Sequence, residues 1–223
     1  MSFNENFDII LPNEFERKYT QRYKQYTYSN IDGYDGIPNW NLKDFGCGPS
    51  SVATILSSIG YDIDPIEVAK IILLDENGNL LDFFTNKEKN RYGLVTLSFI
   101  YLLQELIDKK KFELEYKLVK ISYEYPLLKK EQVINMLMDE YMALILVGPK
   151  GCVNHPRTFS NYGHYIALTS VNKNNQEIYV ANPNKTGDLQ IDTTYSYETI
   201  IANMFNNTYD FLMIKNKSLI KKR

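Results

Sequence analysis

Cys47 is the residue whose type and surroundings point most directly to chemistry. It lies in the segment DFGCGPSS at positions 44–51, and apolar residues recur at helical spacing directly after it, over 52–59. The free N–H groups and partial positive charge of a helix N-terminus favour an anion, and cysteines placed there titrate at about 3.5–7.5 instead of about 8.5. The spacing therefore predicts a nucleophilic thiolate at the start of a buried helix. A buried, inert structural cysteine is the alternative.

The segment around Cys47 carries the start and stop signals of a short helix. Pro49 suits the first turn, where a missing N–H costs nothing, and Gly60 suits the position after the last turn, where φ is often positive. Gly46 and Gly48 would leave room for an incoming carbonyl group. The predicted apolar face consists of Val52, Ile55, Leu56 and Ile59.

A cysteine nucleophile needs a base, and the chain has only two histidines, His155 and His164. His164 opens an apolar segment, 164–171, that indicates a β-strand, so its ring can project from the end of a sheet into a cleft. His155 lies within a polar loop predicted at 148–162, where its geometry would be poorly fixed. We therefore expect His164 to be the base. A surface histidine, or a core histidine with satisfied hydrogen bonds, is the alternative.

The base in turn needs a group that orients its ring, and Asn182 is the candidate. Positions 173–176 predict a hairpin turn between the strand at 164–171 and a second strand at 178–181. Such a hairpin returns Asn182 to the neighbourhood of His164, and Pro183 would end the strand so that the amide side chain can face the ring. An ordinary Asn-Pro turn is the alternative.

Composition narrows the classes of protein to which the chain can belong. The 223 residues are 44% hydrophobic and carry a net charge of −2, so a substantial core can form and nothing favours nucleic acid as a partner. The two cysteines, Cys47 and Cys152, supply neither a disulfide framework nor a zinc-binding quartet, and we expect no metal or other cofactor. A reducing compartment is expected, because a disulfide between them would consume the proposed nucleophile.

The sequence predicts neither a signal peptide nor a membrane span. Residues 1–8 are polar and acidic, without the basic and apolar regions of a secretory signal. No apolar run approaches the roughly 20 residues that cross a bilayer. We expect a cytoplasmic protein, or one that is exported without a recognisable signal peptide.

Helices precede strands along the chain, which predicts an α+β fold. After the helix that follows Cys47, helical patterns occur at 64–73, 95–107, 131–141 and 195–205. Apolar runs predict the strands of an antiparallel sheet at 112–118, 143–147, 164–171, 178–181 and 209–214. We expect a single domain over 1–223, with an N-terminal arm at 1–22, a mainly helical lobe at 23–110 and a mainly β lobe at 111–215.

Three motifs together resemble the papain-like cysteine peptidases. GCGPSSVA at a helix start, YGHYIAL at a strand and VANP after the next strand stand in the order Cys, His, Asn that this family uses. The closest branch is similar to the bacterial double-glycine leader peptidases of bacteriocin exporters, and the resemblance covers about residues 25–184. It implies a papain-like fold, with the cysteine-bearing helix packed on a C-terminal antiparallel sheet. It also implies a peptide or protein substrate and no metal.

Two functional positions of this family are less clear-cut in this chain than the Cys and His positions. The branch usually has Asp before Pro where this chain has Asn182, although papain-type sites use Asn in the same role. The branch also uses an upstream Gln in the oxyanion hole, the pocket that stabilises negative charge on the attacked carbonyl oxygen. Gln25, separated from Cys47 by a Gly-rich insert, is our candidate, and Asn41, at a shorter spacing, is the alternative. In either case the Cys47 N–H would be the other donor.

The resulting hypothesis is a cysteine hydrolase that cleaves a peptide or amide bond. His164 would take the proton of Cys47, and the thiolate would attack a carbonyl to form an acyl-enzyme. An acyltransferase or transglutaminase-like enzyme would use the same groups, with an amine instead of water resolving the acyl-enzyme. A catalytically silent papain-like binding module, or a secreted effector, is a further alternative.

Overall fold

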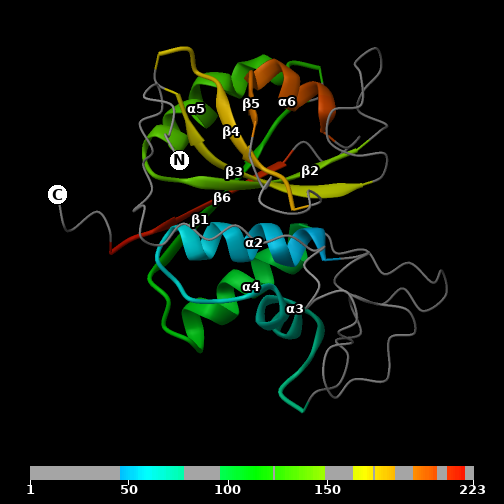
Figure 1. The fold of residues 1–223 in the computed structure, drawn as a ribbon, viewed down its shortest axis with the longest axis vertical. Coiled ribbons are helices and arrows are strands. Elements are labelled where there is room, and N and C mark those ends of the chain that lie inside the picture. Colours follow the sequence, from blue (N-terminus) through cyan, green and yellow to red (C-terminus); the bar gives the residue numbers. More distant parts are fainter. Residues whose placement is uncertain are drawn as a thin grey trace.

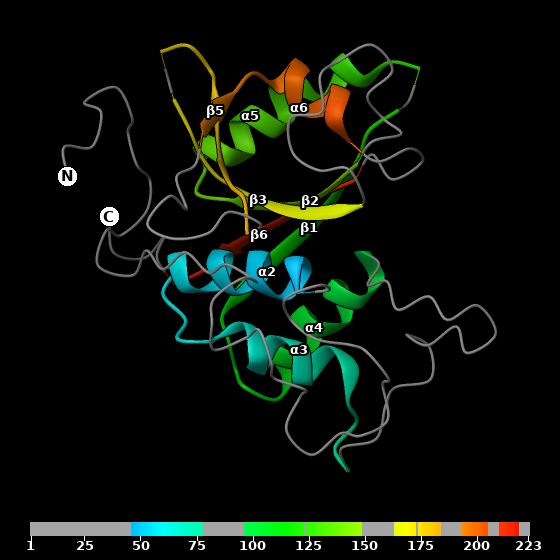
Figure 2. The same cartoon turned by 45° about the vertical axis from the view of Figure 1, so that its right-hand side comes forward.

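The computed structural model describes residues 46–77, 96–122, 124–148, 163–172, 174–183, 193–204 and 210–218. These residues form three layers, in which a central sheet lies between two groups of helices (Figure 1, Figure 2). One face of the sheet is covered by α2 (Cys47–Ser58), α3 (Pro65–Leu73) and α4 (Thr96–Asp108). The other face is covered by α5 (Lys130–Met138) and α6 (Tyr197–Asn203), and a short 3-10 helix, η3 (Pro126–Lys129), precedes α5.

Within the described ranges the sheet has six strands in the order β1-β6-β2-β3-β4-β5, and every neighbouring pair is antiparallel. They are β1 (Leu114–Lys120), β2 (Met142–Val147), β3 (His164–Val171), β4 (Ile178–Ala181), β5 (Thr193–Tyr195) and β6 (Asp210–Asn216). Val147 pairs with His164 and Ala167 pairs with Ala181, so β2 ends, β3 begins and β4 ends at one end of the sheet. The predicted α+β fold is confirmed.

Local signals in the sequence explain where the first two helices begin and end. Gly60 has a φ of +97°, as expected for a glycine after the last turn of a helix. Asp64 caps α3, because its carboxylate accepts the Glu67 N–H at 2.8 Å, and Pro65 is the first residue of that helix. These signals act over a few residues, which is why the sequence reveals them.

The structure differs from the sequence prediction at the bounds of some elements and in two short elements that were not predicted. Strand β1 begins at Leu114 instead of position 112, and the Phe112 N–H donates to the Leu106 carbonyl at 3.0 Å. The Phe112 ring stacks on Tyr61, with centroids 4.1 Å apart. Helix α5 stops before Tyr141, since Glu140 has a φ of +65°. Neither η3 nor β5 was predicted. The predicted arm and lobes (1–22, 23–110 and 111–215) include residues outside the described ranges, and this division stays a prediction.

Helix α2 is buried on all sides. The predicted apolar face is confirmed, since Val52, Ile55 and Leu56 are fully buried. The opposite face is buried too, because the helix lies between the sheet and α3 and α4 (Figure 1). Every residue of α2 except Cys47 is buried, including its five Ser and Thr residues. Of these, Ser51 contacts the sheet, since it donates its hydroxyl hydrogen to the Tyr165 carbonyl at 3.2 Å.

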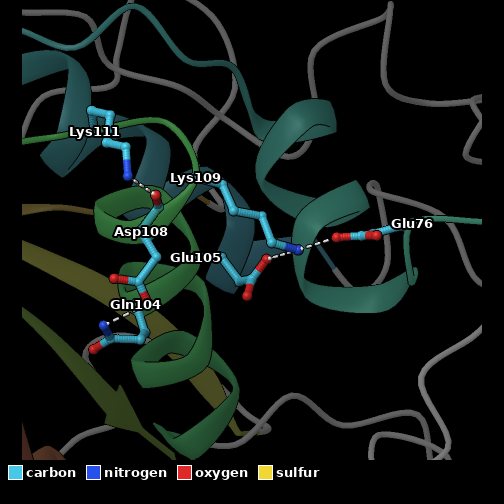
Figure 3. A network of polar contacts seen from close by, with 6 residues as sticks. All are labelled: Glu76, Gln104, Glu105, Asp108, Lys109 and Lys111. Carbon is cyan, nitrogen blue, oxygen red and sulfur yellow. Dashed lines mark hydrogen bonds and ion pairs between the residues drawn. The ribbon is translucent and has the colours of Figure 1, made fainter.

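Polar contacts hold both ends of the helical layer in place. At the end of α2, the buried Asn216 side chain of β6 donates to the Ile59 carbonyl at 2.8 Å. At the end of α4, Lys109 forms ion pairs with Glu105 at 2.8 Å and with Glu76, which follows α3, at 2.7 Å (Figure 3). The pairs around Lys109 lie at the surface, where ion pairs contribute little, so they belong to the scaffold and suggest no chemistry.

The first turns of α2 and α4 meet at Gly48 and Phe99. A Cβ atom at Gly48 would lie 2.4 Å from Cζ of the Phe99 ring. Phe99 is fully buried, so its ring has no free space into which it could turn. Glycine is thus required beside Cys47 for packing against α4, whereas the sequence suggested only that it leaves room for a substrate.

We expect Gly48→Ala to lower the free energy of unfolding by about 1–3 kcal/mol, because the added methyl group overpacks the contact. Urea denaturation of the purified protein measures this loss. Phe99→Leu provides the matched test, because the smaller side chain makes room for the methyl group. The two substitutions should therefore be less destabilising together than the sum of their separate effects. Strict additivity would contradict the proposed clash.

Candidate active site

Cys47 is the first residue of α2, as predicted. The Gly46 carbonyl accepts the Ser50 N–H at 2.9 Å, which closes the first turn around Cys47. The sulfur lies against β3, where it receives a main-chain hydrogen bond from Tyr165 as well as from the N–H groups of its own turn. The helix start and the beginning of β3 thus meet at the thiol.

The ionisation of Cys47 differs from the sequence prediction. The Cys47 side chain is half-buried, and the loss of solvation that a thiolate would suffer there raises the pKa of the thiol above its ordinary value. Main-chain hydrogen bonds from Tyr165, Gly48 and Cys47 itself act in the opposite direction and are outweighed. The expected low-pKa thiolate is therefore wrong for this structure, in which the thiol is neutral near pH 7.

His164 and Asn182 meet at the same end of the sheet. The His164 Nε2 atom lies 2.8 Å from the Asn182 Oδ1 atom. The histidine is 4% exposed, and the asparagine is half-buried. An amide oxygen only accepts hydrogen bonds, so this contact assigns the ring proton to Nε2. In the neutral imidazole the other nitrogen, Nδ1, is then the one that can accept a proton.

The hairpin between β3 and β4 brings these two residues together, as the sequence predicted. Its turn is closed by the Asn172 N–H, which donates to the Glu177 carbonyl at 2.8 Å, and by a positive φ of 57° at Gln176. The pairing of the two strands shifts by one residue between Leu168 and Ser170, and beyond this irregularity Ala181 lies opposite Ala167. Asn182 follows the last residue of β4 and therefore lies at the end of the sheet where β3 begins.

Four predicted positions lie outside the described residues: Gln25, Asn41, Cys152 and His155. The structure therefore leaves the choice between Gln25 and Asn41 as the side-chain oxyanion donor a prediction. The preference for His164 over His155 rests on the contact that His164 makes with Asn182.

Sequence reasoning missed Tyr165, which contacts the site from its position next to His164. Its ring packs edge-on against Phe99 of α4, with centroids 4.9 Å apart, and its carbonyl accepts the Ser51 hydroxyl at 3.2 Å. The signal available in the sequence was a hydroxyl-bearing aromatic residue at the start of a strand whose next residues are aliphatic.

Neither metal chemistry nor a membrane span finds support in the part of the chain that the structure describes. Those residues include no group of three His, Cys, Asp or Glu side chains that could hold a metal ion. Within the same ranges no helix has both the length and the apolar character that crossing a bilayer requires.

Comparison with solved structures finds proteins of similar fold. The chain is similar in fold to a Bacillus anthracis protein described as a C39-like peptidase, with 14% identity, a TM-score of 0.50, and coverage of 78% of this chain and 90% of that chain. A second solved structure is the peptidase domain of Streptococcus ComA, a bifunctional ABC transporter of a quorum-sensing pathway. It shares 13% identity at a TM-score of 0.47, with coverage of 78% of this chain and 93% of that domain.

A search of curated proteins gives no match. The sequence pattern of the Peptidase_C39 like family matches residues 22–213, which is most of the chain and includes Cys47, His164 and Asn182. The predicted resemblance to the double-glycine peptidase branch is thereby confirmed, and the chain belongs to the Peptidase_C39 like family.

Proposed function

We propose that this protein is a cysteine peptidase-like hydrolase that acts on a peptide or amide bond through Cys47, His164 and Asn182. The observation that supports the proposal most is the 2.8 Å contact between His164 Nε2 and Asn182 Oδ1, at the end of the sheet where α2 begins with Cys47. It holds the imidazole in the tautomer whose Nδ1 can act as a base.

The reaction then has two halves. His164 Nδ1 takes the proton from the Cys47 sulfur, and the sulfur bonds to the carbonyl carbon of the substrate. The tetrahedral intermediate collapses as the C–N bond breaks, and the His164 proton passes to the departing amine. In the second half, His164 removes a proton from water, which attacks the thioester and releases the acid, and Cys47 recovers its proton.

Negative charge on the attacked oxygen needs hydrogen-bond donors. The Cys47 N–H in the first turn of α2 is one, and Gln25 is the proposed side-chain donor, with Asn41 as the alternative. Removing one such donor typically slows a reaction by about 10²–10³-fold. Both donors would stabilise negative charge on the carbonyl oxygen, which develops only as the sulfur attacks. This agrees with the raised pKa of Cys47, because the thiol is then neutral before the attack.

One rival function has an observation in its favour. Because burial raises the pKa of the Cys47 thiol, a catalytically silent binding module with an inert cysteine is consistent with the same electrostatics. The two functions differ in the role of His164. In the hydrolase, alkylation of Cys47 by iodoacetamide at pH 7 is faster when His164 is present, whereas in the silent module it is independent of His164.

Cys47→Ser tests the proposed nucleophile. We expect it to lower the rate of hydrolysis of internally quenched peptides, Gly-Gly peptides among them, by about 10³-fold or more, since a hydroxyl is a far weaker nucleophile than a thiol at neutral pH. Cys152→Ser and His155→Ala are the matched controls and should keep wild-type rates. Full activity of Cys47→Ser, on a peptide that the wild type cleaves, would exclude the mechanism.

Asn182 is tested by two substitutions. Asn182→Ala should lower kcat/KM by about 10–100-fold, because the ring is no longer held in place. Asn182→Asp keeps an acceptor oxygen and adds a charge that favours the imidazolium, which raises the pKa of His164. The acid limb of the pH–rate profile, which requires the neutral base, should therefore move to higher pH. The exposed Asn175, at the other end of the same hairpin, provides the control Asn175→Ala. An Asn182→Ala variant with a normal rate and pH profile would remove the residue from the mechanism.

The raised pKa of Cys47 predicts how alkylation and stability depend on pH. Alkylation of Cys47, followed by peptide mass spectrometry, should keep rising above pH 8.5, the ordinary value of a free cysteine. The folded state holds this proton more tightly than the unfolded state does. The corresponding stability is therefore complete below about pH 8.5 and is lost as the pH rises through the folded pKa. Cys47→Ser should remove this loss. An alkylation profile that levels off below pH 7 would show a thiolate–imidazolium pair instead.

A further inference from the structure

Ser50 is a buried residue of α2 whose hydroxyl group has no hydrogen-bond partner in the described part of the chain. Its exposed fraction is 0%, and its oxygen is one of three buried side-chain oxygens without a partner among the described residues. The other two belong to Ser58, the last residue of α2, and to Thr169 in β3. A hydroxyl group that leaves water without gaining a partner raises the free energy of the folded state. Of the three, Ser50 lies in the helical turn that begins at Cys47.

The neighbouring hydroxyl groups show that partners exist for this kind of side chain in α2. The Thr54 hydroxyl donates to the carbonyl four residues before it, that of Ser50, at 2.8 Å. The Ser51 hydroxyl donates to the Tyr165 carbonyl at 3.2 Å. For Ser50 the carbonyl four residues before is that of Gly46, which accepts the Ser50 N–H at 2.9 Å but not its hydroxyl. The Ser50 hydroxyl is therefore available to a different acceptor.

Helix geometry makes the Cys47 sulfur the nearest such acceptor. Residues three apart on a helix are neighbours on one face, with Cβ atoms about 5–6 Å apart. Each Cα–Cβ bond of a helix also tilts toward the N-terminus, so the Ser50 side chain leans over the turn that carries Cys47. Rotation about one bond, χ1, moves the hydroxyl oxygen between its staggered positions while the backbone stays in place.

The elements that contact the first turns of α2 place no cation beside Cys47. None of α2, β3 and α4 contains a lysine or an arginine. The titratable residues of β3 are His164 and Tyr165, and burial raises the pKa of the Tyr165 phenol, which stays neutral. The acidic residues of α4, Glu105 and Asp108, lie toward its other end. Negative charge on the sulfur therefore depends on hydrogen-bond donors and on the candidate base.

We propose that the Ser50 hydroxyl turns to the Cys47 sulfur and donates a hydrogen bond to it when the sulfur loses its proton. The hydroxyl has no partner at rest within the described residues, so this bond stabilises the thiolate without first breaking another bond. Ser50 thereby becomes a further catalytic residue. That role rests on the proposed function, because it assumes that His164 takes the proton, whereas the hydrogen bond itself can be measured without a substrate.

Ser50→Ala removes the hydroxyl oxygen and keeps the rest of the side chain. We expect alkylation of Cys47 by iodoacetamide at pH 7 to be about 3–10-fold slower, because a smaller fraction of the thiol is ionised. The alkylation rate should also keep rising to a higher pH than in the wild type. On a peptide that the wild type cleaves, kcat should fall by a similar factor with KM almost unchanged, since the hydroxyl contacts the sulfur and not the peptide.

Ser58→Ala is the matched control, and urea denaturation supplies a second measurement. Ser58 is also a fully buried serine without a partner among the described residues, but it lies at the opposite end of α2. Neither Ser50→Ala nor Ser58→Ala should lower the midpoint of unfolding, because neither loses a hydrogen bond of the side chain. Ser51→Ala loses its bond with the Tyr165 carbonyl and should lower the midpoint. Ser58→Ala should keep the wild-type rate of Cys47 alkylation.

A His164→Ala background separates a failure of this inference from a failure of the proposed function. Ser50→Ala should slow alkylation by the same factor with and without His164, because the hydroxyl acts on the sulfur and not on the base. That result supports the inference even if His164 has no effect on alkylation and no peptide is cleaved.

Three results would overturn the inference. The first is a Ser50→Ala variant whose Cys47 is alkylated at the wild-type rate. The second is an equal slowing of alkylation in Ser58→Ala, which would indicate a general effect on the helix. The third is a midpoint of unfolding that falls in Ser50→Ala as it does in Ser51→Ala, because the hydroxyl would then have a partner, such as a bound water molecule, in the resting protein.

Discussion

The packing of α2 between the sheet and the other two helices of its layer is the constraint on which the site depends. A helix that is buried on every side cannot tilt or slide without disturbing both neighbours. At β3, the Ser51 hydroxyl of this helix donates to the Tyr165 carbonyl. At the other end Asn216 secures the Ile59 carbonyl. Cys47, the first residue of this helix, is therefore fixed beside the strand that carries His164.

Burial of this kind also decides the electrostatics of the thiol. A helix N-terminus stabilises an anion by about 0.3–1 kcal/mol at an exposed site, whereas removal from water can raise the pKa of a buried acid by several units. At Cys47 the second effect is larger. A place at the start of a helix therefore supplies donors for negative charge without making the resting thiol ionise. The sequence reveals the helix start, but it does not reveal how much solvent the Cys47 thiol loses there.

The sequence predicts the features that are determined by residues close together along the chain. The hairpin that joins His164 to Asn182 follows from a turn and two apolar runs within about twenty positions, and its strands occur at the predicted bounds. The caps of the first two helices are equally local. The contact of Gly48 with Phe99 and the hydrogen bond of Ser51 with Tyr165 join separate elements. The spacing of apolar residues predicts that such residues are buried, but it does not predict which residues they contact.

Asn182 holds the His164 ring without placing a charge beside it. A carboxylate there would favour an imidazolium, which in turn would favour a thiolate across from it. Burying such an ion pair costs solvation free energy, and the attraction between the two charges compensates for only part of that cost. An amide holds the ring through a neutral hydrogen bond, and burial keeps the thiol protonated. Under the proposed function, charge then develops only when a carbonyl carbon meets the sulfur. Fixed donors such as the Cys47 N–H stabilise it there without reorganisation, so they lower the barrier and not the energy of the resting state.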